Sequence, residues 1–214
     1  MSQHTLTLLR FTYKKLKEKL TVSDSKKLFH EQFPYVIPGL YKKVVDEMLV
    51  ELNLLYHQNE FTQEYLFCVG LTETFNELMK GYEPEKHLDI LFESICSSTN
   101  FVAKEIKETS QRFQEEFKDK SSKDLLKVLK EKSDAKLYPS RILNLGMYIL
   151  ISNCQDLKEE NESAINKVIT DIFEKLSISA NKAEKDIGIY KSSISKMQQA
   201  KELIEELRIK DKKK

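Results

Sequence analysis

Three cysteines are the residues of this chain best suited to nucleophilic or redox chemistry. Cys68, Cys96 and Cys154 are widely spaced and odd in number, and each lies beside apolar residues in a segment with helical spacing. This pattern is typical of reduced cysteines that serve as small buried hydrophobic side chains. Cys68 has no basic partner at catalytic spacing, although a residue distant along the chain could lie beside it in the fold. A small-molecule or redox role centred on Cys68 is therefore the alternative function.

The four histidines show no metal-ligand pattern. They have no ligand spacing with one another or with the cysteines, and no glutamate is followed three residues later by a histidine. His57 is expected at the end of a helix, where a cation interacts well with the helix dipole. The five glycines are isolated, so no glycine-rich phosphate loop is present. The four histidines are His4, His30, His57 and His87. We predict no enzyme activity, no catalytic residues, no cofactor and no metal.

One charged pair is expected to join distant segments. On a helical wheel Glu51 falls at the margin of an apolar stripe, where a carboxylate needs a counter-charge if it is buried. Arg141 is one of four arginines and opens a strongly apolar helix. We therefore expect Arg141 to pair with Glu51 or Glu47. The alternative is that Glu51 stays solvated at the rim of the stripe.

Helical periodicity dominates the chain, and it predicts an all-α fold. The most apolar helix covers residues 39–57, where apolar residues recur at spacings of three and four. This helix is apolar around most of its circumference, so we expect a compact multi-helix bundle built around it. Ser23 is the expected N-cap of the first core helix. The longest nearly apolar run, 142–151, is about half the roughly 20 residues that a membrane-spanning helix needs.

Residues 179–214 are expected to form a long C-terminal helical arm. They contain no proline, and their apolar residues keep a heptad spacing that is interrupted at Lys201. The spacing fits packing against the core and fits a coiled coil with another protein equally well. The chain therefore divides into a basic N-terminal extension (1–20), a helical core domain (21–178) and the C-terminal helix with its basic tail (179–214). The oligomeric state is not fixed by these patterns.

Charge is concentrated at the two ends of the chain. The net charge is +1, but residues 1–20 and residues 208–214 each carry five basic side chains against one acidic one. Such ends could contact an anionic membrane surface, or they could simply aid solubility. No basic stripe with interleaved aromatic residues is present, which argues against nucleic acid binding. The extension 1–20 is open to three interpretations: a targeting leader, a membrane-touching helix or a disordered extension.

Five segments in order along the chain resemble the thylakoid formation protein family, also described as photosystem II biogenesis factors. They are TVSDSKKLF (21–29), YKKVVDEMLVELNLL (41–55), LFCVGLTETFNELMKGYEPE (66–85), YPSRILNLGMY (138–148) and EKDIGIYKSSISKMQQA (184–200). The likeness covers roughly residues 21–210. Cys68 departs from the family, which commonly has alanine there, and residues 1–20 exceed the family's usual short start.

The resemblance implies a non-enzymatic accessory or adaptor protein that acts through protein contacts. The implied partners are the photosystem II assembly and repair machinery and an FtsH-type membrane protease. The implied location is the plastid stroma, or the cytoplasm of an oxygenic phototroph, with peripheral association to the thylakoid membrane. The family supplies no catalytic residues to carry over.

Overall fold

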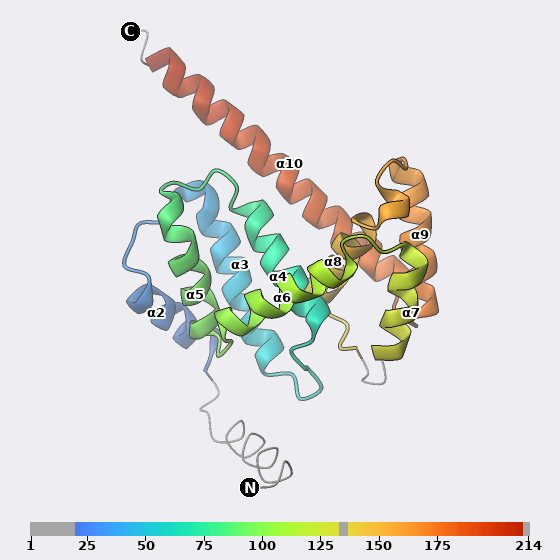
Figure 1. Cartoon of the computed structure of the whole chain (residues 1–214). Helices are drawn as coiled ribbons and strands as arrows, with labels where there is room; N and C mark the ends of the chain where they lie inside the picture. The colour runs from blue at the N-terminus through green and yellow to red at the C-terminus, as the bar shows by residue number, and fades with distance from the viewer. Residues whose placement is uncertain (1–19, 133–136, 212–214) are drawn as a thin grey trace, which may run out of the picture.

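The computed structural model describes residues 20–132 and 137–211. Over these residues the chain forms nine α-helices and two short 3-10 turns and contains no strand, so the predicted all-α fold is confirmed (Figure 1). The predicted N-terminal extension lies outside the described residues except for Leu20. The elements are α2 (Val22–Gln32), α3 (Gly39–Tyr56), α4 (Tyr65–Leu78), η1 (Glu85–His87), α5 (Leu88–Ser98), α6 (Ala103–Phe117), α7 (Ser122–Lys132), α8 (Arg141–Ser152), η2 (Gln155–Leu157), α9 (Glu162–Lys175) and α10 (Ala180–Asp211).

Helix α2 begins two residues earlier than its sequence suggested. The N-cap is Thr21 rather than Ser23: the Thr21 hydroxyl accepts a hydrogen bond from the Asp24 N–H, and the Asp24 carboxylate accepts one from the Thr21 N–H. This reciprocal capping box satisfies two backbone donors at once, which a cap at Ser23 would not achieve. The Asn53 side chain of α3 donates to the Leu20 carbonyl and to the Ser25 hydroxyl, and so fixes the start of α2 against α3.

The helix at the centre of the fold is α4. It contributes Phe67, Leu71 and Phe75 to an aromatic-rich cluster with α2, α3 and α5, and Leu66 and Val69 to a second cluster with α6 to α10. Nine of its fourteen residues are buried, and its polar side is limited to a short stripe near its C-terminal end, at Glu73, Asn76 and Glu77. The two clusters therefore form one continuous core on opposite sides of a single helix.

Helix α3, expected at the centre, is instead one wall of the core. Its inner face is buried through Val45, Leu49 and Leu52, but its outer face carries lysines and acidic residues and is exposed. Outside its main apolar stripe, Leu54 does not reach the core and is 53% exposed, whereas Leu40 packs against it partly buried. The helix is amphipathic, and the apolar residues on its outer side belong to a surface groove described below.

Two glycines bring α4 and α8 into direct backbone contact. A Cβ atom on Gly70 would lie 2.0 Å from the Ile142 carbonyl oxygen, and one on Gly146 would lie 2.0 Å from the Leu66 carbonyl oxygen. Each of these Cβ atoms would also lie 2.9 Å from the other glycine's backbone nitrogen. Since no real Cβ tolerates such contacts, both positions require glycine. This crossing fixes Arg141, at the start of α8, close to α3 and α4.

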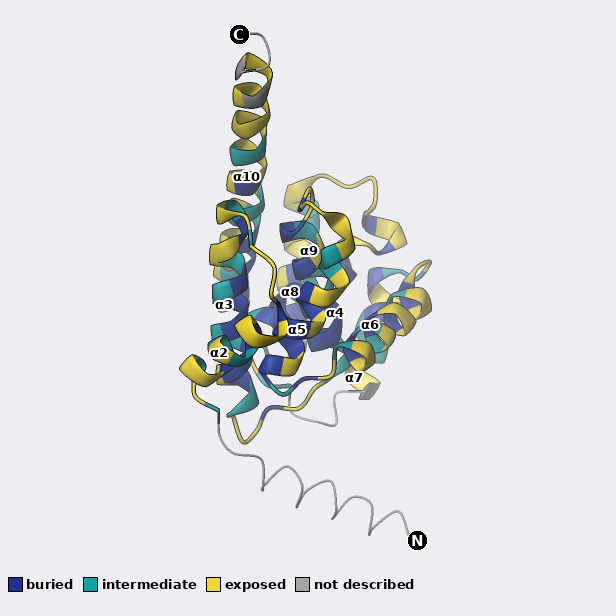
Figure 2. Ribbon diagram, turned by 90° about the vertical axis from the view of Figure 1, so that its left-hand side faces the viewer, coloured by how far each residue is buried: buried dark blue, intermediate teal, exposed yellow. Residues whose placement is uncertain are grey.

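Helix α10 confirms the predicted long arm and is half buried and half free. Its first half packs on the core through Ala183, Ile187, Tyr190 and Met197, four residues of the predicted heptad seam. Lys201 still reaches the core, with its Nζ atom 5.9 Å from the centroid of the Tyr41 ring. Beyond Lys201 the helix projects away from the other helices toward the C-terminus (Figures 1 and 2). We call residues 198–211 the arm tip. No helix among the described residues is long and apolar enough to cross a membrane.

Candidate functional site

The three cysteines are structural. Each side chain is buried, and burial raises the pKa of each thiol to about 12. A thiol with such a pKa is protonated at neutral pH and is a poor nucleophile. Cys68, which packs in the core beside Phe67 and Leu71, is also closed to a substrate. The alternative role centred on Cys68 therefore has no accessible nucleophile.

The histidines that the structure describes are His30, His57 and His87. His57 ends α3 with its Nδ1 atom 2.7 Å from the Asn53 carbonyl oxygen, as expected for a histidine at a helix C-terminus. The His87 ring stacks on Tyr35 at 3.9 Å between centroids. Among the residues that the structure describes, no three histidine, cysteine or acidic side chains are grouped to hold a metal. His4 lies outside the described residues.

Arg141 pairs with Glu51, one of the two partners that the sequence predicted, whereas Glu47 forms its ion pair with Lys43. The Arg141 Nε donates to Glu51 Oε2 at 3.1 Å, and Arg141 Nη2 donates to the same oxygen. Burial alone would lower the pKa of Arg141, but the hydrogen bond and charge of Glu51, together with the charges of Glu47 and Asp186, raise that pKa. The Glu51 side chain is only 18% exposed, so it is not a solvated rim residue. The pair links the start of α8 to the middle of α3.

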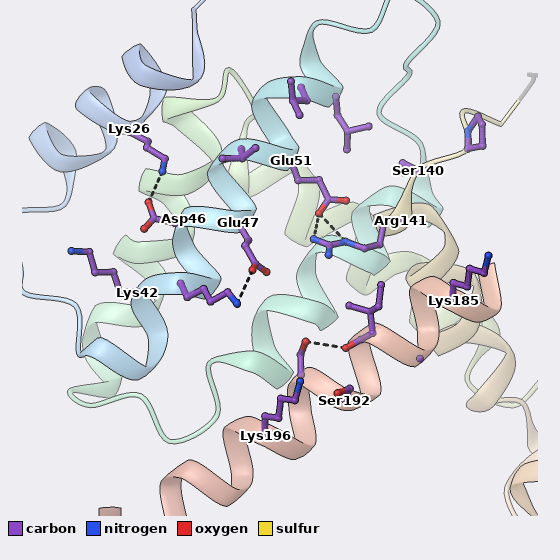
Figure 3. Close-up of a pocket in the computed structure, with 18 of the residues that line it drawn as sticks. Lys26, Lys42, Asp46, Glu47, Glu51, Ser140, Arg141, Lys185, Ser192 and Lys196 are labelled. Atoms are coloured by element: carbon purple, nitrogen blue, oxygen red, sulfur yellow. Dashed lines mark hydrogen bonds and ion pairs between the residues drawn. The ribbon is translucent and has the colours of Figure 1, made fainter. Parts of the chain in front are cut away.

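This ion pair lies in the floor of a long groove between α3 and α10 (Figure 3). The groove has a volume of about 1400 Å³, and residues 138–141 form part of its lining. Its apolar surface includes Leu54 on α3 and Ile189 on α10, which are 53% and 54% exposed. Small residues keep the α10 side open, since a Cβ on Gly188 would meet nothing within 4 Å. We call this feature the α3–α10 groove.

The α3–α10 groove carries an excess of positive charge. Six basic and three acidic side chains line it, and each acidic side chain has a basic partner. Asp46 pairs with Lys26 at 2.9 Å and Glu47 with Lys43 at 3.8 Å, while Glu51 is held by Arg141. Three lysines are left without an acidic partner within the described part of the chain; they are Lys42, Lys185 and Lys196.

The arm tip is the second unusual surface. Four large apolar side chains on it are 40 to 58% exposed, although soluble proteins generally bury such residues: Leu203, Ile204, Leu207 and Ile209. The sequence predicted the helix but not its division into a part packed on the core and an exposed tip. A heptad pattern of apolar residues is the same whether it contacts the core or solvent. The groove was not predicted either. The one sequence feature that could have indicated the groove is a second stripe on α10, on the side opposite the buried residues. It recurs at spacings of three and four at Lys185, Ile189, Ser192 and Lys196.

Comparisons with known proteins agree on one family. The model of a family described as "Thylakoid formation protein" matches residues 21–214. A protein named Thf1 from Prochlorococcus marinus (strain MIT 9312) is 79% identical over 199 residues, which are 93% of this chain and 99% of the relative. A Thf1 protein from Synechococcus sp. (strain CC9605) is 40% identical over 192 residues, with 87% of each chain covered.

A solved structure of Psb29 has the same fold. It matches with a TM-score of 0.80 and 24% identity, and the match covers 91% of this chain and 98% of that chain. At this identity the likeness concerns the fold alone. The arrangement of helices seen here therefore has an experimental counterpart.

Proposed function

This chain belongs to the thylakoid formation protein family, and from that premise we propose that it is a non-enzymatic adaptor in thylakoid membrane biogenesis. Its specific task is the assembly and repair of photosystem II, and it acts by binding other proteins. The fold supports this role in two ways. The three cysteines are buried in the core, and large apolar side chains are exposed on the arm tip.

The exposed apolar arm tip is the observation that carries the proposal. A helix with large apolar side chains in solvent is suited to pair with a helix or a groove of another protein. The tip projects beyond the core, so a partner can approach it from all sides (Figure 1). The part of α10 before the tip is anchored in the core by Tyr190 and Met197, so the tip extends from a fixed position.

The proposed partners are the photosystem II assembly and repair machinery, including an FtsH-type membrane protease. An adaptor that positions a protease near damaged membrane proteins needs a rigid body and a projecting contact surface. The core and the arm supply these two parts. This assignment rests on the family and on the shape of the chain together.

We place the protein at the thylakoid surface on the cytoplasmic side of a phototroph. The relatives reported above are cyanobacterial, which favours the cytoplasm over a plastid stroma. The basic ends of the chain would add about 1 kcal/mol of attraction per lysine or arginine near an anionic surface. Co-sedimentation with anionic liposomes should therefore fall with rising salt, and binding unaffected by salt would count against membrane contact.

The test is affinity purification of the tagged protein from thylakoid-containing cells, followed by mass spectrometry. FtsH-type protease or photosystem II assembly subunits should be enriched with the full chain. Truncation after Gln198 should abolish this enrichment while it leaves the core intact, because Met197 is the last buried residue of α10.

A matched pair of variants separates the arm tip from exposed apolar residues in general. Leu203→Ser combined with Leu207→Ser should lose the partners, whereas Val36→Ser combined with Val102→Ser should keep them, since Val36 and Val102 are exposed elsewhere. Equal recovery of partners with both double variants would overturn the assignment of the contact to the tip.

A further inference from the structure

The size of the α3–α10 groove suits a protein segment. Its volume of about 1400 Å³ exceeds the range of roughly 300–1,000 Å³ that is usual for small-molecule pockets. Leu54 on α3 and Ile189 on α10 offer apolar contacts from its two walls. Lys185 and Lys196 add positive charge on α10, while the Lys42 side chain on α3 points away from α10 (Figure 3). An occupant with matching chemistry is a helix that carries both apolar and acidic side chains.

The arm tip carries both kinds of side chain, together with the basic Lys201, Arg208 and Lys210. Leu203 and Leu207 are 58% and 52% exposed, and the acidic Glu202 and Glu206 flank them on the helix. The tip and the groove also share one face of α10. Lys185, Ile189, Ser192 and Lys196 line the groove, and Gln199, Leu203 and Glu206 continue the same three-four spacing beyond it.

The tip cannot reach the groove of its own chain, because both belong to one continuous helix, Ala180–Asp211. A second copy related by a two-fold axis across α10 would meet it in antiparallel orientation. Each tip would then lie in the other copy's groove, and the same patch would be used twice. The lengths agree: residues 185–196 and 199–210 each span about 17 Å at 1.5 Å per residue.

We propose that the α3–α10 groove receives the arm tip of a second copy of this chain, in a reciprocal antiparallel pair. Leu203 and Leu207 contact Leu54 and Ile189, and the Glu202 carboxylate approaches Lys196. The inference does not depend on the proposed function. A partner that binds the tip would compete with this pairing. In the paired form the tip is therefore covered until a partner displaces the second copy.

The experiment is analytical ultracentrifugation of the full chain over a range of concentrations. A reversible monomer–dimer equilibrium is expected. In a groove variant, Lys196→Glu should weaken dimerisation about tenfold or more, because the new carboxylate then lies within one turn of Glu202 of the second copy. In a tip variant, Glu202→Lys combined with Glu206→Lys should weaken it similarly. Circular dichroism and thermal melting verify that both variants fold.

Mixing the two variants gives the decisive result. The acidic groove of one variant suits the basic tip of the other, and the two unaltered surfaces also match, so an equimolar mixture should recover the heterodimer. Three outcomes would overturn the proposal: a monomer at all concentrations, a dimer that neither variant weakens, or variants that remain monomeric when mixed. The groove variant keeps its tip and should still capture partners, which separates this test from that of the proposed function.

Discussion

At the scale of single residues, the Arg141–Glu51 pair shows how a half-buried charge can join two distant segments. Both side chains are partly shielded from water, and two hydrogen bonds converge on one carboxylate oxygen. The interaction is therefore stronger than a typical surface ion pair, and removing one partner leaves the other poorly solvated.

A double-mutant cycle tests this. Arg141→Met and Glu51→Gln should each lower the free energy of unfolding by about 1–2 kcal/mol, and the double variant should lose about 1 kcal/mol less than their sum. Lys43→Met and Glu47→Gln alter an exposed pair on α3 and should change stability by less than about 0.5 kcal/mol. Urea unfolding measures all six proteins, and equal effects from both pairs would contradict the structural role of Arg141.

The buried thiols predict a loss of stability in alkali. Burial raises the pKa of Cys68, Cys96 and Cys154 from near 9 to about 12, so the native state keeps protons that the unfolded state releases. The stabilisation is complete below pH 9 and is lost as the pH rises toward 12, by up to about 1.4 kcal/mol per pH unit for each thiol. The free energy of unfolding, measured with urea at pH 8 and at pH 10.5, gives this loss of stability.

The control for the alkaline effect is Cys96→Ala, which removes one titrating group. Its free energy of unfolding should fall less steeply with pH than that of the unaltered protein. Identical slopes would mean that the native thiol ionises as readily as the unfolded one. The same burial predicts that thiol reagents label the native protein at pH 8 only after denaturant is added.

At the scale of elements, the crossing of α4 and α8 depends on the absence of two side chains. Gly70→Ala or Gly146→Ala should lower the free energy of unfolding by about 3 kcal/mol or more, because the new methyl group meets backbone atoms that cannot move aside. Gly188→Ala on α10 is the matched control. It has open space around it and should gain about 0.5–1 kcal/mol, since alanine favours the helix. A tolerated Gly146→Ala would contradict the contact.

The sequence predicted the helices well and their arrangement less well. Periodicity indicated the position of α3 and the long C-terminal helix, since local spacing decides both. It assigned the centre of the core to α3 because Val50 and Leu54 made that helix apolar all round, and the structure turns them outward to the groove. The glycines at 70 and 146 looked isolated, because their pairing depends on how the chain folds back.

At the scale of the whole molecule, the prediction from residues covered the fold class and one ion pair between distant helices. Arg141 and Glu51 could be paired because each was an exception on an otherwise apolar helix face. The α3–α10 groove could not be predicted, because it arises between helices far apart in the sequence. The division at 178 stays a prediction; the structure shows that the first half of α10 completes the core, through Ile187 and Tyr190.

The half-anchored helix α10 has a consequence for amide hydrogen exchange. Opening the amides before Met197 disturbs the core, so they should exchange as slowly as the slowest amides of the protein, whereas those of the arm tip need only local fraying. Exchange measured by mass spectrometry should therefore accelerate steeply along one unbroken helix. Whatever binds the tip must also order it, so slowed exchange there, with the first half unchanged, would report occupancy directly. Part of the binding energy is then spent on stiffening the tip, which favours a partner that leaves quickly.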